Sequence, residues 1–451
     1  VSWAASPDGQ APVHPVPGPC AVLGWSRVTS HGTNRCGEPR VLLEEPVKSM
    51  SIGFEEALRL TFEAIGPLPA ESVGLLECVG RVAASDLFAL VDSPSSDVSR
   101  KDGYAVVYGE VKDATAAVPV RLSLAGSTSA GAAKNIVLTE GTTVRVLTGA
   151  RVPAGADAVV ADEYIRADGR DILIESPPDE PDRNILARGR DVRAGQRLIE
   201  AGRRISPAAA GFLAAAGLGR VPVFSKPVVG IVGTGDEIVE PGAPLAEDRL
   251  YASNIVTLAG WCMRSGLRSL TAIVKDDPDS ILAAFRRMSM ETDALITSGG
   301  AWKGDRDLVA DVLERMGWRK IFHQIRMGPG KAVGLGVLNG KPVFILPGGP
   351  PSNFMAFLQI AWPGLMRLGG HEEPGLPRVK AKLSAGITEG NAGWTDLFFG
   401  TVEETEDLPL FHPMEKRSRL SSIAEATAVA SIPEDRDHLA QGSVISVQLL
   451  T

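Results

Sequence analysis

Cysteine is scarce in this chain of 451 residues, which has only Cys20, Cys36, Cys78 and Cys262. No two of them stand in a C-x-x-C pair, which argues against a zinc site and a disulfide framework and fits the reducing cytoplasm. The six histidines form no i, i+4 pair and no H-E-x-x-H pattern. The sequence therefore lacks the common signatures of zinc enzymes and of disulfide-stabilised secreted proteins.

Long apolar runs and an excess of positive charge are also lacking. No uninterrupted apolar stretch is long enough to span a bilayer. Asp and Glu number 54 against 46 Lys and Arg, and the net charge of −8 gives no global basic signal for nucleic acid. With 44% hydrophobic residues, the composition is ordinary for a globular protein of two to four domains. We therefore expect neither a membrane nor a nucleic-acid partner.

Residues 1–49 differ from the rest of the chain. They are rich in Pro, Gly and Ser, carry Trp3 and Trp25 in isolation, and show no sustained hydrophobic periodicity. We expect this segment to be disordered or a non-native extension, with Met50 as the natural start. Mass spectrometry of the native N-terminus would test this, since peptides from residues 1–49 would contradict it.

The most informative stretch begins at residue 294. A short apolar run ends in Ser298, Gly299 and Gly300 follow, and a charged loop with Asp305 and Asp307 leads into an amphipathic segment. This pattern predicts a buried strand, a tight turn and a helix. The glycines would let oxyanions approach backbone N–H groups, and the carboxylates suit a divalent cation or an attacking water. The same residues also fit an ordinary strand–helix turn, with glycine for positive φ and Asp as a cap.

Apolar and amphipathic segments alternate from about residue 226 to 370. The expected strands are 228–232, 269–274, 293–297 and 320–324, and the expected helices include 253–263, capped by Ser253-Asn254, and 280–290. Asn339-Gly340 predicts a hairpin between 333–338 and 342–346. This alternation predicts a three-layer α/β domain with a mostly parallel sheet. Ligands of such sheets bind at the carboxyl ends of the strands, where the glycines and charges of this region lie.

The remaining segments predict three further parts. Short strand-like runs make residues 118–176 β-rich, Ser206-Pro207 caps a helix over 208–216, and short strands recur from 379 to 450 as a small β-barrel or sandwich.

The loops that follow the expected strands combine hydroxyls, bare backbone and charge. They are Thr234-Gly235-Asp236-Glu237, the Ser298 loop with Asp307, the Pro-Gly-Lys loop of Lys331, and Pro347-Gly348. This set suits a phosphorylated, anionic ligand with a divalent metal. It is not a Rossmann fingerprint, because Gly233-x-Gly235 lacks the third glycine, and the chain has no G-x-x-x-x-G-K-[ST].

These motifs, in this order, resemble those of the molybdopterin molybdenumtransferase family, called MoeA in bacteria and similar to the E domains of gephyrin and of the plant molybdenum insertase. The matching segments are Ser99…Asp102-Gly103-Tyr104-Ala105, Thr148-Gly149…Asp157…Glu163, Thr234-Gly235-Asp236-Glu237, Gly299-Gly300…Gly304-Asp305-Arg306-Asp307, Pro329-Gly330-Lys331 and Leu346-Pro347-Gly348. The similarity runs from about residue 50 to the end of the chain.

The resemblance implies an enzyme of molybdenum cofactor biosynthesis: a cytoplasmic transferase that works as a homodimer. Its substrate would be adenylated molybdopterin, whose pyrophosphate is cleaved with release of AMP as molybdate, the co-substrate, is inserted into the dithiolene. Mg²⁺ would assist. The resemblance further implies a linking helical domain at 50–95 and 183–225, a β-rich inserted domain at 96–182, an α/β molybdopterin-binding-like domain at 226–370 and a C-terminal β-barrel domain at 371–451.

The resemblance also implies the roles of individual residues. Asp307, Asp236 and Lys331 would be catalytic, and Asp236, Glu237 and Asp307 would hold the metal. Asp102, Thr148 and Glu163 would reach the substrate from the partner subunit. The other substrate-binding residues would be Thr234, Gly235, Ser298, Gly299, Gly300, Asp305, Pro347, Gly348 and Ser352.

The chain departs from the family motifs at several positions, among them Trp302, Gly328, Ala332 and Gly349. Trp302 stands where the family usually has Ser, which replaces a hydrogen-bond donor by a bulky ring. These changes concern the metal-insertion step more than the pterin pocket. The alternative function is therefore a divergent paralogue that binds or delivers the pterin cofactor without inserting metal.

Overall fold

The computed structural model describes residues 51–132, 136–299, 308–388, 390–414 and 420–450. The predictions for residues 1–49, Gly300, Trp302, Asp305 and Asp307 lie outside these ranges. No helix in the described ranges is long and apolar enough to cross a membrane.

A six-stranded sheet forms the centre of the α/β part, with strand order β17-β14-β18-β22-β21-β19. The strands are β14 Val228–Thr234, β17 Arg268–Val274, β18 Ala294–Ser298, β19 Arg319–His323, β21 Gly334–Leu338 and β22 Lys341–Leu346. The first four strands of that order pair in parallel, and the last two pair antiparallel. The mostly parallel sheet predicted from the alternating pattern is confirmed. Its central strands are apolar because helices cover both faces.

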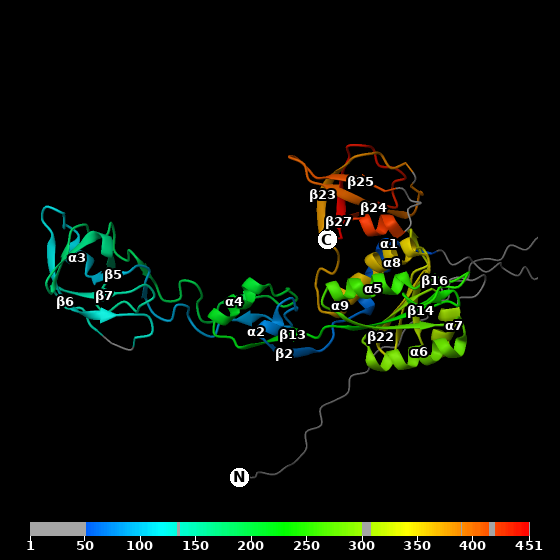
Figure 1. Ribbon diagram of the computed structural model, residues 1–451, viewed down its shortest axis with the longest axis horizontal. Helices are drawn as coiled ribbons and strands as arrows, with labels where there is room; N and C mark the ends of the chain where they lie inside the picture. The colour runs from blue at the N-terminus through cyan, green and yellow to red at the C-terminus, as the bar shows by residue number, and fades with distance from the viewer. Residues whose placement is uncertain (1–50, 133–135, 300–307, 389, 415–419, 451) are drawn as a thin grey trace, which may run out of the picture. The chain divides into compact units, whose positions relative to one another are not determined.

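Five helices cover this sheet, and two separate apolar clusters lie on its faces. The helices are α5 Ser253–Arg264, α6 Pro278–Glu291, α7 Leu308–Arg315, α8 Pro350–Ala356 and α9 Trp362–Leu368, with a π-turn at Phe357–Ala361 between the last two. Ile231 packs with residues of α5, α8 and α9, whereas its neighbour Val232 packs with residues of α6 and α7. Successive strand residues point to opposite faces, and Figure 1 shows the resulting three layers.

Local signals explain how several of these elements begin and end. The predicted hairpin is confirmed, since Asn339 and Gly340 join β21 to β22 with φ of 50° and 79°, the left-handed values that such a two-residue turn requires. The predicted Ser253-Asn254 cap is wrong. The residue before α5 is Ala252 and provides no side-chain cap, and the Asn254 amide is hydrogen-bonded elsewhere.

The linking part combines helices with short strands, so it contains more sheet than predicted. Its elements are β1 Ile52–Gly53, α1 Phe54–Ala64, β2 Ala70–Gly74, α2 Leu75–Cys78, β3 Leu87–Phe88, β11 Ile185–Leu186, β12 Arg197–Ile199, α4 Pro207–Ala215 and β13 Arg220–Phe224. Strand β11 pairs with β4 Val98–Ser99, which lies just beyond the predicted boundary at residue 95. The Ser206 cap is confirmed, because its hydroxyl accepts a hydrogen bond from the Ala209 N–H at 3.1 Å.

The β-rich part contains a second six-stranded sheet, with strand order β8-β5-β7-β6-β10-β9. Its elements are β5 Gly103–Val106, α3 Tyr108–Val111, β6 Val120–Thr128, β7 Thr142–Val146, β8 Ala158–Ala161, the 3-10 turn Asp162–Tyr164, β9 Ile165–Asp168 and β10 Asp171–Ile174. The β-rich character predicted for residues 118–176 is therefore confirmed.

The C-terminal part is a five-stranded barrel rather than a sandwich. Its strands run in the order β24-β25-β23-β27-β26, and β24 also pairs with β26, which closes the sheet. The elements are β23 Arg378–Leu383, β24 Thr395–Glu403, β25 Leu410–Pro413, α10 Leu420–Glu425, β26 Ala428–Ile432 and β27 Val444–Leu449. Strands β1 and β20, the latter Ile325–Gly328, extend this sheet beyond β24.

Candidate functional site

A cavity of about 780 Å³ lies at the carboxyl ends of β14, β18 and β22, and we call it the sheet-edge cavity. The predicted site residues that line it are Thr234, Glu237, Ser298, Gly299, Gly348 and Ser352. Its volume falls within the range of small-molecule and cofactor sites. The site thus lies at the strand ends where parallel sheets bind their ligands.

The first two of these strand-end loops meet backbone to backbone. Gly299, which follows β18, has φ of +96°, and a Cβ there would lie 2.3 Å from the carbonyl oxygen of Thr234 at the end of β14. Only glycine allows this approach. A Cβ on Gly348, after β22, would lie 3.6 Å from the Gly299 Cα, so the third loop reaches the same point. The glycines thus leave bare backbone facing one space.

Two asparagine amides tie these loops together. Asn254 Nδ2 donates to Ser298 Oγ at 3.1 Å and to the Gly348 carbonyl at 2.8 Å. Asn353 Nδ2 donates to the same Ser298 Oγ at 3.0 Å and to the Pro347 carbonyl at 2.8 Å. Sequence reasoning missed both roles. The available signal was a lone amide, Asn353, in the apolar segment that begins α8.

Some polar atoms at this edge have no partner within the described part of the chain. Thr234 Oγ1, Thr297 Oγ1 and Asn353 Oδ1 are buried without a hydrogen bond. Leaving such a group unpaired costs about 1–3 kcal/mol. Of the three, Thr234 belongs to the lining of the cavity, so a polar ligand or ion there would relieve this cost.

Glu237 is the carboxylate that the described lining contributes to the cavity. Its side chain occupies the space beside Gly235, where a Cβ would come within 2.7 Å of Oε2. Asp236 is exposed and outside the lining. Within the described ranges no three His, Cys, Asp or Glu side chains gather closely enough to hold a metal. A Mg²⁺ ion needs only one or two carboxylates beside substrate phosphates, and Glu237 with the unpaired Thr234 hydroxyl fits that requirement.

The Pro-Gly-Lys loop reaches the cavity through Pro329 rather than through Lys331. Lys331 is exposed, and its ammonium lies 5.4 Å from the centroid of the Trp394 indole. Gly235 and Pro347 also adjoin the cavity without lining it. The Gly235 N–H donates to the Val274 carbonyl at 3.2 Å.

Two family models and a relative of known name match most of this chain. A family model described as "MoeA N-terminal region (domain I and II)" matches residues 52–217, and one described as "Probable molybdopterin binding domain" matches residues 230–367. A Mycobacterium tuberculosis protein named molybdopterin molybdenumtransferase 2 is 31% identical over 403 residues, which are 88% of this chain and 99% of that protein. The chain belongs to the molybdopterin molybdenumtransferase (MoeA) family.

Further MoeA relatives agree with this assignment. The Bacillus subtilis molybdopterin molybdenumtransferase is 29% identical over 409 residues, which cover 89% of this chain and 95% of that one. The crystal structure of the MoeA protein from Pyrococcus horikoshii superposes with a TM-score of 0.77 at 30% identity, covering 89% of this chain and 99% of that one. The similarity therefore extends over all parts of the MoeA architecture.

The MoeA residues expected to act from a partner subunit lie in the β-rich part. Asp102 Oδ1 accepts hydrogen bonds from the Thr148 N–H at 2.7 Å and from the Thr148 hydroxyl at 2.8 Å. The backbone bond first, and then the hydroxyl bond, hold the pKa of Asp102 below its usual value. Glu163 lies exposed in the 3-10 turn after β8. Asp102, Thr148 and Glu163 are distant in sequence from the residues that line the sheet-edge cavity.

Proposed function

We propose that this chain inserts molybdate into adenylated molybdopterin and releases AMP, with the sheet-edge cavity as its substrate site. The observation that carries the proposal is the meeting of three strand-end loops, at Thr234, Gly299 and Gly348, around one cavity in a chain of the MoeA family. The relatives at about 30% identity are named for molybdenum transfer to molybdopterin.

The uncharged groups of the cavity suit the substrate's phosphates and rings. The Gly348 backbone N–H and the Ser298 hydroxyl would bind phosphate oxygens, while the Gly299 N–H already donates to the Leu346 carbonyl at 3.3 Å. The amides of Asn254 and Asn353 position these groups, because they tie the loops together before the ligand arrives. Apolar side chains of the lining, Ile238, Leu250, Tyr251 and Leu420, would pack against the flat rings.

Carboxylates would hold Mg²⁺ at one side of the cavity. Glu237 lines it, Asp236 precedes Glu237 in the chain, and Asp307 follows β18 in the sequence. When bound, Mg²⁺ neutralises charge on phosphate oxygens. The described lining of the cavity contains no Lys, Arg or His side chain, so the ion would take on that task.

The reacting bond is the phosphoanhydride that joins the two phosphates of the substrate. Water attacks one phosphorus, the P–O bond of the anhydride breaks and AMP leaves. The two dithiolene sulfurs then bind molybdenum, and one molybdate oxygen leaves as water with the thiol protons. Asp307 and Asp236 would be the acids nearest this bond, Lys331 would contact its oxyanions by swinging from Trp394, and Ser352 would face the molybdate. Asp305 and Gly300 would complete the loop around the phosphates.

A homodimer would complete the site from the second subunit. Asp102, Thr148 and Glu163 of the β-rich part would close over the substrate held by the α/β part of the partner. The hydrogen-bonded Asp102–Thr148 pair presents a fixed carboxylate suited to such a role. We further propose that the enzyme acts in the cytoplasm, in keeping with its buried free thiols at Cys78 and Cys262.

The test is incubation of the purified chain with adenylated molybdopterin, Mg²⁺ and molybdate, followed by measurement of AMP. We expect AMP release that requires all three, and its loss in Asp307→Asn with substrate binding retained. Tight binding without any AMP release would instead identify a cofactor-binding paralogue. No described contact favours that alternative, and the relatives carry the transferase name.

A further inference from the structure

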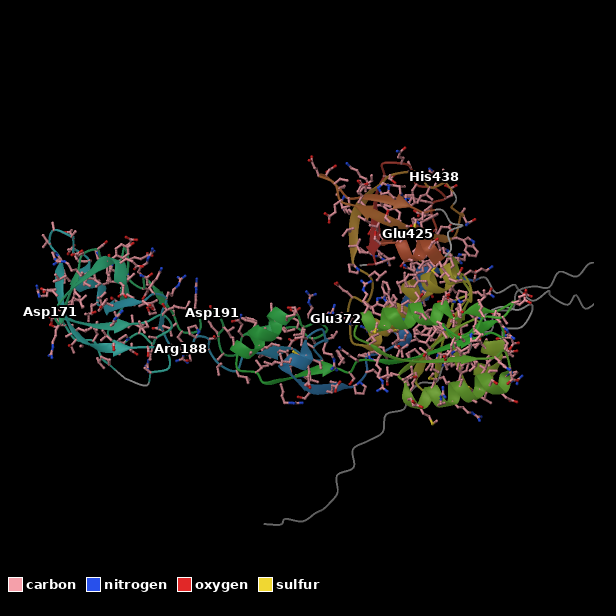
Figure 2. The ribbon with its side chains drawn as sticks, viewed as in Figure 1. Asp171, Arg188, Asp191, Glu372, Glu425 and His438 are labelled. Atoms are coloured by element: carbon pink, nitrogen blue, oxygen red, sulfur yellow. The ribbon has the colours of Figure 1, made fainter. Side chains whose placement is uncertain are left out.

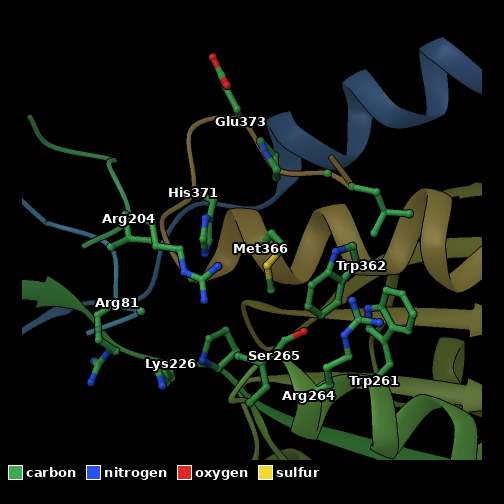
Figure 3. Close-up of a pocket in the computed structure, with 18 of the residues that line it drawn as sticks. Arg81, Arg204, Lys226, Trp261, Arg264, Ser265, Trp362, Met366, His371 and Glu373 are labelled. Carbon is green, nitrogen blue, oxygen red and sulfur yellow. The ribbon is translucent and has the colours of Figure 1, made fainter. Parts of the chain in front are cut away.

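A second cavity, of about 370 Å³, is lined by basic side chains that the reaction above does not use. We call it the basic cavity and define it by Arg81, Arg204, Lys226, Arg264 and His371 (Figure 3). These residues come from the segment after α2, the segment before α4, the connection from β13 to β14, the last turn of α5 and the segment after α9. Tertiary folding brings together cations that are scattered in the sequence.

Arg81, Arg204 and Lys226 lie close enough for their charges to interact. Partial burial first, and then the charges of Arg81 and Arg204, lower the pKa of Lys226. Burial and the charge of Arg204 likewise lower the pKa of His371. Figure 3 shows the Arg204 guanidinium beside the His371 ring. The positive charges of Arg81 and Arg204 repel that of Lys226, and a bound anion would relieve this repulsion.

Acidic residues balance only part of this charge within the described part of the chain. Glu71 pairs with Arg81, whereas Arg204 and Lys226 have no carboxylate within ion-pair distance there. Glu373 lines the cavity but is exposed, and Figure 3 shows its carboxylate directed away from the labelled cations. Glu372, labelled in Figure 2, packs beside Gly202. A Cβ added to Gly202 would lie 2.3 Å from the Glu372 side chain.

Unpaired donors point to the same conclusion. The Arg81 side chain is only 10% exposed; its Nη2 donates to the Phe224 carbonyl at 2.8 Å, but its Nε is buried without a partner. Trp261 Nε1 is also buried and unpaired. Arg264, by contrast, donates to the Leu450 carbonyl and stacks over Trp261 at 4.8 Å. The donors left over are suited to an oxyanion.

We propose that the basic cavity binds a tetrahedral oxyanion, either free phosphate or the phosphoryl group of a small molecule. Arg204 and Lys226 would supply the charge, and Arg81 would supply a buried donor. The wall formed by Trp362 and Met366 would accept an apolar substituent of the ligand. This site is separate from the sheet-edge cavity, and the proposal does not rest on the enzymatic function.

The test measures binding of inorganic phosphate and of phenyl phosphate by titration calorimetry on the full chain. We expect saturable binding that weakens at least tenfold in Arg204→Gln and in Lys226→Met and persists in Lys226→Arg. Arg287→Gln, an exposed basic residue of α6, is the control for net charge. Tighter binding of phenyl phosphate identifies an organic phosphate, and equal binding identifies the free oxyanion.

A measurement on the unaltered chain protects the test against misfolded variants. Acetylation of Lys226, followed by mass spectrometry, should slow at least threefold in saturating phosphate, while the exposed Lys275 keeps its rate. Gly299→Ala should leave phosphate protection of Lys226 unchanged, because it alters only the sheet-edge cavity. Equal acetylation of Lys226 with and without phosphate, or binding that is the same in Lys226→Met, would overturn the proposal.

Discussion

The sheet-edge cavity and the basic cavity differ in where their polar groups come from. The first is built mostly from backbone and uncharged side chains at the ends of neighbouring parallel strands, where Gly299 lies close to Thr234 and Gly348, with Glu237 as the charged group of its described lining. The second is built from the tips of long charged side chains, such as Arg204 and Lys226. Ligand binding by backbone groups depends on loop positions to within fractions of an ångström. Ligand binding by charged side chains depends on pH and salt concentration.

This difference decides how each cavity should respond to change. Substitutions that move a loop should abolish function at the sheet edge while leaving charge unaltered. Substitutions that remove a charge should alter binding and stability at the basic cavity while leaving the loops in place. The following predictions, from the largest expected effect to the smallest, would strengthen or remove this contrast.

The largest effect is expected from Gly299→Ala. A methyl group there would collide with the Thr234 carbonyl at 2.3 Å and would have to adopt φ of +96°. Displacing the loop by about 1 Å should lower AMP release roughly 100-fold. Gly349→Ala is the matched control, because a Cβ at Gly349 meets nothing within 4 Å. Equal activity of the two variants would show that close loop contact is not required.

Asn353→Leu should destabilise the fold as well as the site. Asn353 is 1% exposed, and the substitution removes its bonds to Ser298 and Pro347. Ser298 would keep its hydrogen bond from Asn254, but leaving the Pro347 carbonyl unpaired should lower the free energy of unfolding by about 1–3 kcal/mol in urea titrations. Asn254→Ala removes the second amide, which is less buried, and should affect substrate affinity more than stability. A stability unchanged by Asn353→Leu would contradict the tie between loops.

Lys226→Met should slightly stabilise the chain in phosphate-free buffer. Because the folded state lowers the pKa of Lys226, it disfavours the charged lysine, and wild-type stability should rise as pH increases from that lowered pKa toward 10.5. Removing the charge should raise the free energy of unfolding at pH 7 by less than about 1 kcal/mol, since the side chain is largely exposed. Urea midpoints at pH 7 and pH 10 would measure this, and a lower midpoint for the variant would contradict it.

The smallest effect is a pH dependence from His371. Its folded-state pKa is lowered, so the unfolded chain takes up a proton first as pH falls below about 6.5. Wild-type stability should therefore decrease from pH 7.5 to pH 5, and His371→Gln should reduce that decrease. His438→Gln, at an exposed position, is the control (Figure 2). If stability changed equally with pH in wild type and in His371→Gln, His371 would not contribute to the electrostatics of the basic cavity.

Sequence reasoning anticipated the elements around the sheet-edge cavity more closely than their contacts. Apolar runs of strand length mark β14 and β18 in the sequence, and glycine with charged residues follows each run. Buried parallel strands and their ligand-binding loops produce this local pattern. The predicted helix cap at Asn254 is wrong because a local pattern gives no information about distant partners. Its residue type and position fit a local role, and the sequence contains no sign of partners 44 and 94 positions away.

The sequence by itself determined the order of strands and helices, the glycine loops after them and the MoeA family motifs, since each of these is a pattern over a few neighbouring residues. Only the tertiary structure decided that two amides hold Ser298 and that Arg81, Arg204 and Lys226 share a cavity. Contacts between distant segments follow from how helices and sheets pack, and no local pattern records which side chains that packing brings face to face.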